Sequence, residues 1–420
     1  MITRIEVRNY RCLHYISQGL DSFHVLVGPN ASGKTTFLDV VAFLGDLLSY
    51  GLLEAIHERT NNFHDLLWWS KGDGFEIAIE AAIPEQLRTT LREPSSDTVR
   101  YEVALQLNEE TQEIIIQSEK VFLKTSLPEP IDQQRLLFPE NKEPPDTIIS
   151  PTRAKGSSII VSKVQNGNAN FYSEIYHRKG KGWAPSFKLG SQKSALGNLP
   201  ADETNFPVTS WLKSLLTENV TRLVLNSLLI RKASPPGQGI NFKPDGSNLP
   251  WVIDHFNKIN SVRFEKWLQH LQTALPDLQN IRTVERPDDR HRYLILEYRG
   301  GLTVPSWMIS DGTLRLLALT ILAYLPDFKG SYLIEEPENG IHPKAVETLF
   351  QSLSSAYDAQ ILVATHSPVI LSMVDVEKVL CFAKTEEGAV DIIQGNKHPA
   401  LRDWQGETNL GVLFAAGVLG

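Results

Sequence analysis

The sequence predicts a mixed α/β protein whose parallel-sheet core is split between the two ends of the chain. Near the N-terminus, an apolar strand at residues 24–27 leads through a glycine-rich loop into a helical run at 35–48. Helix and strand patterns alternate again from residue 311 to residue 364, which is typical of a parallel sheet flanked by helices. Between these parts lie short alternating runs, typical of an antiparallel sheet, and then a stretch with helical spacing. We therefore expect a core interrupted by a large insertion.

These changes of pattern divide the 420 residues into four predicted regions. Residues 1–70 and 286–420 form the two parts of the core, 71–200 form an antiparallel β region, and 201–285 form a helical insertion. Within the β region, residues 127–151 are rich in proline and acidic side chains, so we expect a surface loop or a mobile insertion there.

Composition and charge indicate a globular protein and argue against nucleic-acid-coating and membrane-spanning proteins. Hydrophobic residues make up 42% of the chain and charged residues 21%, as in an ordinary globular protein. A net charge of −8 argues against a protein that coats nucleic acid indiscriminately, because neutralising phosphates requires clustered lysine and arginine. No run of about 18 apolar residues occurs, the first residues do not resemble an export signal, and the two cysteines lack metal-ligand spacing. We expect a cytoplasmic protein without a membrane span.

The segment from Gly28 to Thr35, GPNASGKT, has the spacing of a phosphate-binding loop, with an apolar strand before it and a helix after it. Its glycines allow backbone N–H groups to point at phosphate oxygens, and the helix N-terminus adds partial positive charge. Lys34 would reach the β and γ phosphates, and the Thr35 hydroxyl would bind Mg²⁺. The expected nucleotide contacts are Gly28, Pro29, Asn30, Ala31, Ser32, Gly33, Lys34, Thr35 and Thr36. A chance glycine-rich turn is the alternative, and the flanking strand and helix argue against it.

Two adjacent carboxylates end the apolar strand YLIEE. Because successive side chains of a strand face opposite ways, Glu335 and Glu336 can serve different purposes. We assign Glu335 to the Mg²⁺ ion and Glu336 to the attacking water, since phosphoryl transfer needs both a metal ion and an oriented nucleophile. Taken alone, the pair could also mark an acidic turn.

Two further segments occupy positions expected for a ligand site. His366 follows the apolar strand ILVA, at the edge of the sheet where ligands bind, and could bond the γ-phosphate; a structural histidine is the alternative. Ser310, Asp311 and Gly312 begin a helix and leave its backbone amides accessible, although a plain capped helix explains these residues equally well.

Together, in this order, these four segments and the opening IEVRNYRCL resemble the ABC-type ATPases of the SMC, RecF and OLD group, in particular the compact OLD-like AAA ATPases. The resemblance implies a split ABC-type P-loop ATPase head with an antiparallel β lobe and an inserted helical subdomain. GPNASGKT is then the Walker A loop, YLIEE the Walker B strand, THS the switch-histidine loop and ISDGT a variant signature. Three departures stand out: Glu335 replaces the usual aspartate, no Q-loop glutamine is identified, and Tyr10 is only a candidate for stacking on adenine.

The resemblance also implies cofactors and partners. ATP and Mg²⁺ are the expected cofactors, with Lys34, Glu336 and His366 as catalytic residues. A homodimer or higher oligomer is expected, with the signature residues 310–312 of one head facing the P-loop of another. OLD nucleases carry a TOPRIM nuclease domain after the ATPase, but only 54 residues follow His366, so we expect no nuclease domain in this chain.

A basic segment lies within the β region. Residues 151–193 hold eight lysines and arginines against one acid, Glu174. Arg178, Lys179, Lys181 and Trp183 could contact the phosphates and bases of a nucleic acid, or a partner protein. A solvated hairpin tip explains them equally well.

The expected function is an ATP-hydrolysing switch subunit in a process that involves DNA or RNA. The resemblance implies bacterial antiviral (anti-phage) defence with a separate nuclease or toxin as effector. The alternative is a scaffold that binds ATP without hydrolysing it and holds an oligomeric complex together. An ABC transporter subunit fits less well, because of the large insertion and the ISDGT signature.

Overall fold

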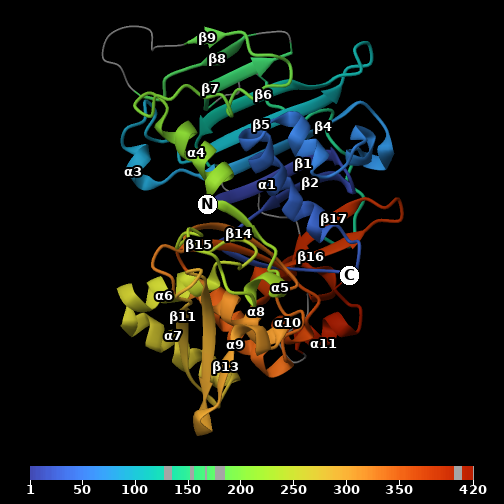
Figure 1. Ribbon diagram of the computed structural model, residues 1–420. Helices are drawn as coiled ribbons and strands as arrows, with labels where there is room; N and C mark the ends of the chain where they lie inside the picture. Colours follow the sequence, from blue (N-terminus) through green and yellow to red (C-terminus); the bar gives the residue numbers. More distant parts are fainter. Residues whose placement is uncertain (127–134, 152–155, 166–167, 176–184, 402–408, 420) are drawn as a thin grey trace. The chain divides into compact units, whose positions relative to one another are not determined.

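The computed structural model describes residues 1–126, 135–151, 156–165, 168–175, 185–401 and 409–419 (Figure 1). The chain forms two compact units. The first comprises Met1–Val220, Glu377–Trp404 and Leu419–Gly420, and the second comprises Thr221–Val376 and Gln405–Val418. Each unit therefore draws on segments that lie far apart in the sequence.

An eight-stranded antiparallel sheet forms the larger part of the first unit, in the order β2-β1-β4-β5-β6-β7-β8-β9 (Figure 1). Its strands are β1 (Ile2–Tyr10), β2 (Leu13–Gly19), β4 (Gly74–Ala82), β5 (Thr98–Leu107), β6 (Ile114–Lys124), β7 (Ser157–Val164), β8 (Ala169–Phe171) and β9 (Ser186–Phe187). The sheet confirms the antiparallel region that the alternating runs predict, and it also includes the first two strands of the chain, β1 and β2.

Three strands of a second sheet also belong to the first unit. β3 (Phe23–Val27) runs parallel to β16 (Val379–Lys384), which pairs antiparallel with β17 (Val390–Gln394). A strand from the beginning of the chain thus lies directly beside one from near its end. The helices of this unit are α1 (Lys34–Ser49), α2 (Leu52–His57), α3 (Glu85–Arg88) and α4 (Pro207–Glu218).

Helix α1, which begins at the phosphate loop, is anchored by a buried carboxylate. Asp39 accepts hydrogen bonds from the Tyr10 hydroxyl at 2.6 Å and from Arg59 Nε at 2.8 Å. The ring of Tyr10 packs against Phe43 of α1 and Phe75 of β4, with centroids 5.8 and 4.9 Å away. These contacts fix the helix against β1 and β4.

The described part of the proline-rich stretch, residues 135–151, is bonded to strands of the first unit. Arg135 forms an ion pair with Asp391 of β17 at 2.8 Å. The Ile148 N–H donates to Glu76 of β4 at 2.7 Å, and the Ser150 N–H donates to Glu102 of β5 at 2.8 Å. Carboxylates on strands of two sheets therefore hold this stretch at several points.

The second unit contains neighbouring strands in the order β10-β14-β15 and a three-stranded antiparallel sheet, β11-β12-β13. Strands β14 and β15 are parallel. The strands are β10 (Val220–Leu223), β11 (Leu278–Glu285), β12 (Arg292–Tyr298), β13 (Thr303–Pro305), β14 (Gly330–Glu335) and β15 (Ala359–Ala364). The helices are α5 (Ser227–Ile230), α6 (Leu249–Ile259), α7 (Ser261–Ala274), α8 (Asp311–Thr320), α9 (Pro343–Ser354), α10 (Pro368–Leu371) and α11 (Leu410–Ala415).

Apolar helix faces form the core of the second unit. Trp267 of α7 is fully buried, and its indole N–H donates to the Thr320 hydroxyl of α8 at 3.0 Å. Helix α8 ends at Thr320 and is followed by a 3₁₀ turn, Leu322–Tyr324. Among the described residues, no helix is both long and apolar enough to cross a bilayer.

Candidate functional site

The phosphate loop in the first unit lies between β3 and α1. Gly28 and Gly33 have φ angles of 148° and 100°, and Ala31 has 61°, backbone conformations that residues with side chains seldom adopt. Lys34 is only 7% exposed, and its Nζ donates hydrogen bonds to the carbonyl oxygens of Gly28 and Pro29 at 2.8 and 3.0 Å. The ammonium group therefore lies within the turn of the loop, beside the N-terminus of α1.

Close packing around the loop requires both glycines. A Cβ at Gly28 would lie 2.2 Å from the Phe382 carbonyl oxygen in β16, and a Cβ at Gly33 would lie 2.6 Å from Val390 Cγ2 in β17. Cβ atoms essentially never approach other heavy atoms within 3.0 Å. Strands β16 and β17, from the C-terminal part of the chain, thus limit the space around the phosphate loop, which lies near the N-terminus. A core split between the two ends of the chain requires such contacts.

The other expected nucleotide contacts differ in exposure. Ser32 is buried and its hydroxyl oxygen lies 3.4 Å from Lys34 Nζ. The Thr36 hydroxyl lies 3.5 Å from Cys12 Sγ, so the side chain at this position faces the β1–β2 turn. The exposed members are Pro29, Asn30, Ala31 and Thr35. Contact of these residues with a nucleotide stays a prediction.

The structure corrects the suggestion that Tyr10 stacks on adenine. Tyr10 is fully buried, and its hydroxyl is bonded to Asp39. Burial and the neighbouring carboxylate raise the pKa of Tyr10 well above its usual value. A ring enclosed by Phe43 and Phe75 has no face available for a ligand base.

In the second unit, Glu335 ends β14 and forms an ion pair. Arg222 of β10 places its Nη2 atom 2.8 Å from Glu335 Oε1, and both side chains are partly exposed. The carboxylate that we assign to Mg²⁺ is therefore already paired with a cation from the neighbouring strand. Nothing in the spacing of the sequence points to Arg222.

Glu336, the next residue, has a φ angle of 45°, although it is not a glycine. Its backbone N–H donates to the carbonyl oxygen of Ala364 at the end of β15, at 2.7 Å. The Asn339 side-chain amide donates to Glu336 Oε2. The second carboxylate of the pair is thus oriented by a strained backbone and by its own loop.

The segment that carries His366 is bonded to the same loop. Glu338 Oε1 accepts the Thr365 hydroxyl at 2.5 Å and the His366 backbone N–H at 3.2 Å. The imidazole of His366 lies 6.5 Å, between ring centroids, from Phe414 of α11. The structure therefore brings Glu336 and His366 onto two loops that are bonded to each other, and it adds Glu338, which the sequence analysis did not single out.

The expected signature residues begin α8. The Ser310 hydroxyl caps the helix by accepting the Thr313 N–H at 3.3 Å, and Asp311 forms an ion pair with Arg231. A Cβ at Gly312 would lie 2.1 Å from the carbonyl oxygen of Gly340. Packing within the chain is thus sufficient to explain the glycine at this position, without contact with a second subunit.

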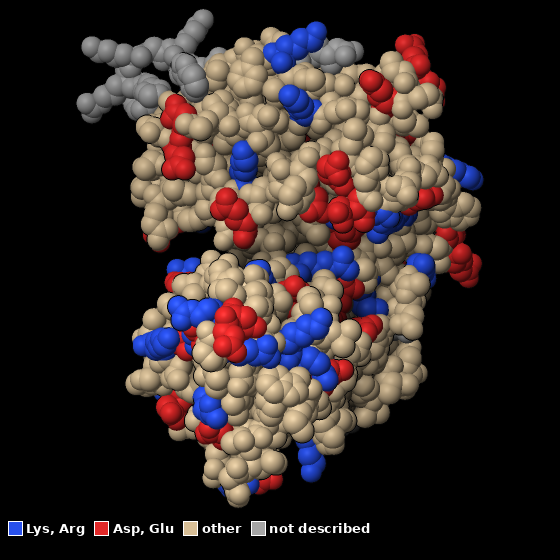
Figure 2. Space-filling view, viewed as in Figure 1, with Lys and Arg blue, Asp and Glu red and all other residues tan. Residues whose placement is uncertain are grey.

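The basic residues Arg178, Lys179, Lys181 and Trp183 lie outside the described residues. Figure 2 shows basic and acidic side chains intermingled on the visible face of each unit. The face shown therefore has no broad surface of a single sign.

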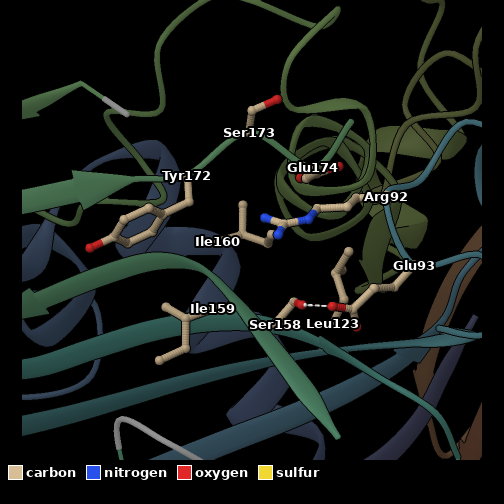
Figure 3. Close-up of a pocket in the computed structure, with 9 residues that line it drawn as sticks. All are labelled: Arg92, Glu93, Leu123, Ser158, Ile159, Ile160, Tyr172, Ser173 and Glu174. Atoms are coloured by element: carbon tan, nitrogen blue, oxygen red, sulfur yellow. Dashed lines mark hydrogen bonds between the residues drawn. The ribbon is translucent and has the colours of Figure 1, made fainter. Parts of the chain in front are cut away.

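A separate pocket of about 230 Å³ lies in the first unit (Figure 3). It is lined by Arg92, Glu93, Leu123, Ser158, Ile159, Ile160, Tyr172, Ser173 and Glu174. The guanidinium of Arg92 points into it, and the Ser158 hydroxyl donates to Glu93 at 2.7 Å. The Glu174 carboxylate accepts the N–H groups of Val208 and Thr209 at 2.6 and 2.8 Å, so this acid caps α4.

Comparison with known proteins identifies the fold. Among solved structures, the chain is similar to an Smc head bound to the C-terminal winged-helix domain of ScpA, with 13% identity, 93% of this chain and 97% of that chain covered, and a TM-score of 0.53. It is also similar to an Smc head with an extended coiled coil bound to the C-terminal domain of ScpA derived from Pyrococcus furiosus, with 13% identity, coverage of 93% and 95%, and a TM-score of 0.50. These likenesses confirm the predicted ABC-type P-loop head.

Sequence comparison identifies the family. No curated protein matches the chain. The family model described as "AAA domain, putative AbiEii toxin, Type IV TA system" matches residues 23–372, which include the phosphate loop, Glu335, Glu336 and His366. The chain belongs to this AAA-domain family.

Proposed function

We propose that the chain is an ATP-binding and ATP-hydrolysing switch subunit of an oligomeric complex. The geometry of the phosphate loop carries the proposal. Two glycines with positive φ, the buried ammonium of Lys34 and the start of α1 at the same residue form a site suited to nucleotide phosphates. Membership of an AAA-domain family supports the same activity.

The donor groups assigned to ATP and Mg²⁺ suit these ligands. Glu335 and Thr35 offer the hard oxygen atoms that Mg²⁺ prefers, and Lys34 offers a cation to phosphate. When bound, the ion would neutralise charge that develops on the transferred phosphoryl group. Glu336 would hold and orient the attacking water, and His366 would donate a hydrogen bond to the γ-phosphate.

Phosphate release tests this proposal directly. Glu336→Gln keeps the size of the side chain but removes the base, so we expect turnover to fall by about 10²-fold or more while ATP still binds. Glu347→Gln is the matched control, because Glu347 is an exposed acid of α9 in the same unit. Lys34→Ala should weaken ATP binding itself. Turnover that is unchanged in Glu336→Gln would contradict the assignment, and ATP binding without any turnover would favour the scaffold.

We further propose that two heads associate head-to-tail around ATP. In this arrangement Ser310 and Gly312 of one subunit complete the site at the Lys34 loop of the other. Light scattering on Glu336→Gln should then show a dimer or higher oligomer with ATP and a smaller species without it. Mixing a Lys34 variant with a Ser310 variant should restore at most one active site per dimer, whereas full activity of each variant alone would contradict a shared site.

The wider role that we propose is in bacterial defence, in the cytoplasm and with a separate nuclease or toxin as effector. The family description, which names an AbiEii toxin of a type IV toxin–antitoxin system, supports a role of this class. Co-purification of the full chain with the products of neighbouring genes would identify the effector. Binding of labelled DNA or RNA should weaken with salt and on neutralising Arg178, Lys179 and Lys181; binding that survives those changes would exclude this contact.

A further inference from the structure

Glu338 lies in the loop after β14, and its carboxylate bonds to the segment that carries His366. Its Oε1 atom accepts the Thr365 hydroxyl at 2.5 Å and the His366 N–H at 3.2 Å. Thr365 is fully buried, and its own hydroxyl oxygen accepts the Ser367 N–H at 2.9 Å. Glu338 therefore holds the turn after β15 through a chain of hydrogen bonds that solvent does not reach easily.

The two loops are joined at a second point, close to the first. The Glu336 N–H donates to the Ala364 carbonyl oxygen at 2.7 Å, one residue before Thr365. The Asn339 N–H donates to the Glu336 carbonyl oxygen at 3.1 Å, and the Asn339 side chain donates to the Glu336 carboxylate. The loop is thus fixed to the end of β15 and the turn after it at Glu336 and at Glu338, and Asn339 closes the loop onto Glu336.

The second carboxylate oxygen of Glu338 indicates that this residue has a role other than stabilising the fold. Its Oε2 atom is buried and has no hydrogen-bond partner within the part of the chain that the structure describes. Burying an unpaired carboxylate oxygen is unfavourable. A group retained in spite of its cost to stability points to a function.

We propose that Glu338 is a positioning residue that aligns His366 with Glu336. It acts through Thr365 and the backbone of His366, and it need not touch the nucleotide. The inference rests on the proposed ATPase function, because it places these two groups about the same phosphoryl transfer. A displacement of about 1 Å in such a site lowers the rate by about 10²-fold.

Two pairs of variants separate positioning from a general structural role. Glu338→Ala removes the acceptor, whereas Glu338→Gln keeps an oxygen where both hydrogen bonds end. Thr365→Val removes the donated hydroxyl, whereas Thr365→Ser keeps it. Steady-state ATP hydrolysis gives kcat and KM for each variant, and thermal unfolding shows whether it folds.

We expect Glu338→Ala to lower kcat by about 10- to 100-fold with KM changed less than about threefold, and Glu338→Gln to restore most of the rate. Thr365→Val should lower kcat in the same way, Thr365→Ser should not, and the double variant Glu338→Ala/Thr365→Val should be no slower than Glu338→Ala alone. If Glu338→Ala does not fold, the comparison of Thr365→Val with Thr365→Ser tests the inference.

Other results would overturn the inference. A wild-type kcat in Glu338→Ala or in Thr365→Val would remove Glu338 from the alignment of the site, while leaving the ATPase proposal intact. Additive effects of the two changes would show that Glu338 does not act through Thr365. Absence of turnover in the unaltered chain, with ATP bound, would instead overturn the proposed ATPase function, and the positioning role with it.

Discussion

Replacing Gly28 by alanine should destabilise the first unit more than the same change at another glycine with positive φ. Two costs add at Gly28. A φ of +148° is strained for a residue with a side chain, at about 1–3 kcal/mol. In addition, the new Cβ would lie 2.2 Å from the Phe382 carbonyl oxygen, so β16 would have to move, at about another 1–3 kcal/mol. We therefore expect a loss of about 4 kcal/mol in the free energy of unfolding.

Gly51 provides the matched control. Its φ is +98°, it belongs to the same unit, and nothing lies within 4 Å of an added Cβ. Gly51→Ala should therefore show only the cost of strain, about 1–3 kcal/mol. Urea unfolding followed by tryptophan fluorescence would compare the two variants. A Gly28→Ala midpoint at or above that of Gly51→Ala would refute the conclusion that β16 shapes the phosphate loop.

Three further predictions concern buried groups of the first unit. Tyr10→Phe removes the hydroxyl bonded to Asp39 and should cost about 1–2 kcal/mol in urea unfolding; no change would show that this bond contributes nothing. Burial raises the pKa of Glu174 from 4.5 to about 6, so its contribution to stability is full below pH 4.5 and is lost as the pH rises through 6. Glu174→Gln should therefore gain about 2 kcal/mol relative to the wild type between pH 4.5 and 7, and a constant difference would contradict the raised pKa. Burial also raises the pKa of the Cys381 thiol to about 12, so a maleimide at pH 7 should label half-buried Cys12 and leave Cys381 unlabelled until the chain unfolds, as mass spectrometry can establish.

Much of the fold follows from local patterns in the sequence. Alternating apolar residues predict the antiparallel strands, and the strand before Gly28 and the strand before Glu336 predict the two parts of the core. The pairing of β3 with β16 could not be predicted in this way, because no local pattern records which distant strands lie side by side. The hairpin of β11 and β12 crosses the expected boundary at residue 285, since a strand pair formed by neighbouring segments need not respect a change in composition.

The candidate site likewise contains some residues that local patterns predict and others that they do not. Lys34, Glu336 and His366 could be proposed from the sequence because each lies in a segment that follows an apolar strand, and the ends of parallel strands are where ligands bind. Arg222 and Glu338 could not be assigned, because their roles arise from contacts across 113 and 27 residues. The segment EEPEN holds three acids, but a single sequence does not distinguish such a group of acids from an acidic turn.

The backbone of this segment now separates the two explanations of its acids. An acidic turn that served only to reverse the chain would have glycine or asparagine wherever the backbone is left-handed. The loop does so at Gly340, where φ is +77° and nothing surrounds an added Cβ, but at Glu336 a glutamate takes a φ of 45°. That conformation costs about 1–3 kcal/mol and persists because Ala364 and Asn339 hold the residue at its N–H, its carbonyl and its carboxylate. A carboxylate kept at a strained position, and held there from three sides, is better explained by a requirement for its charge than by a requirement for a turn.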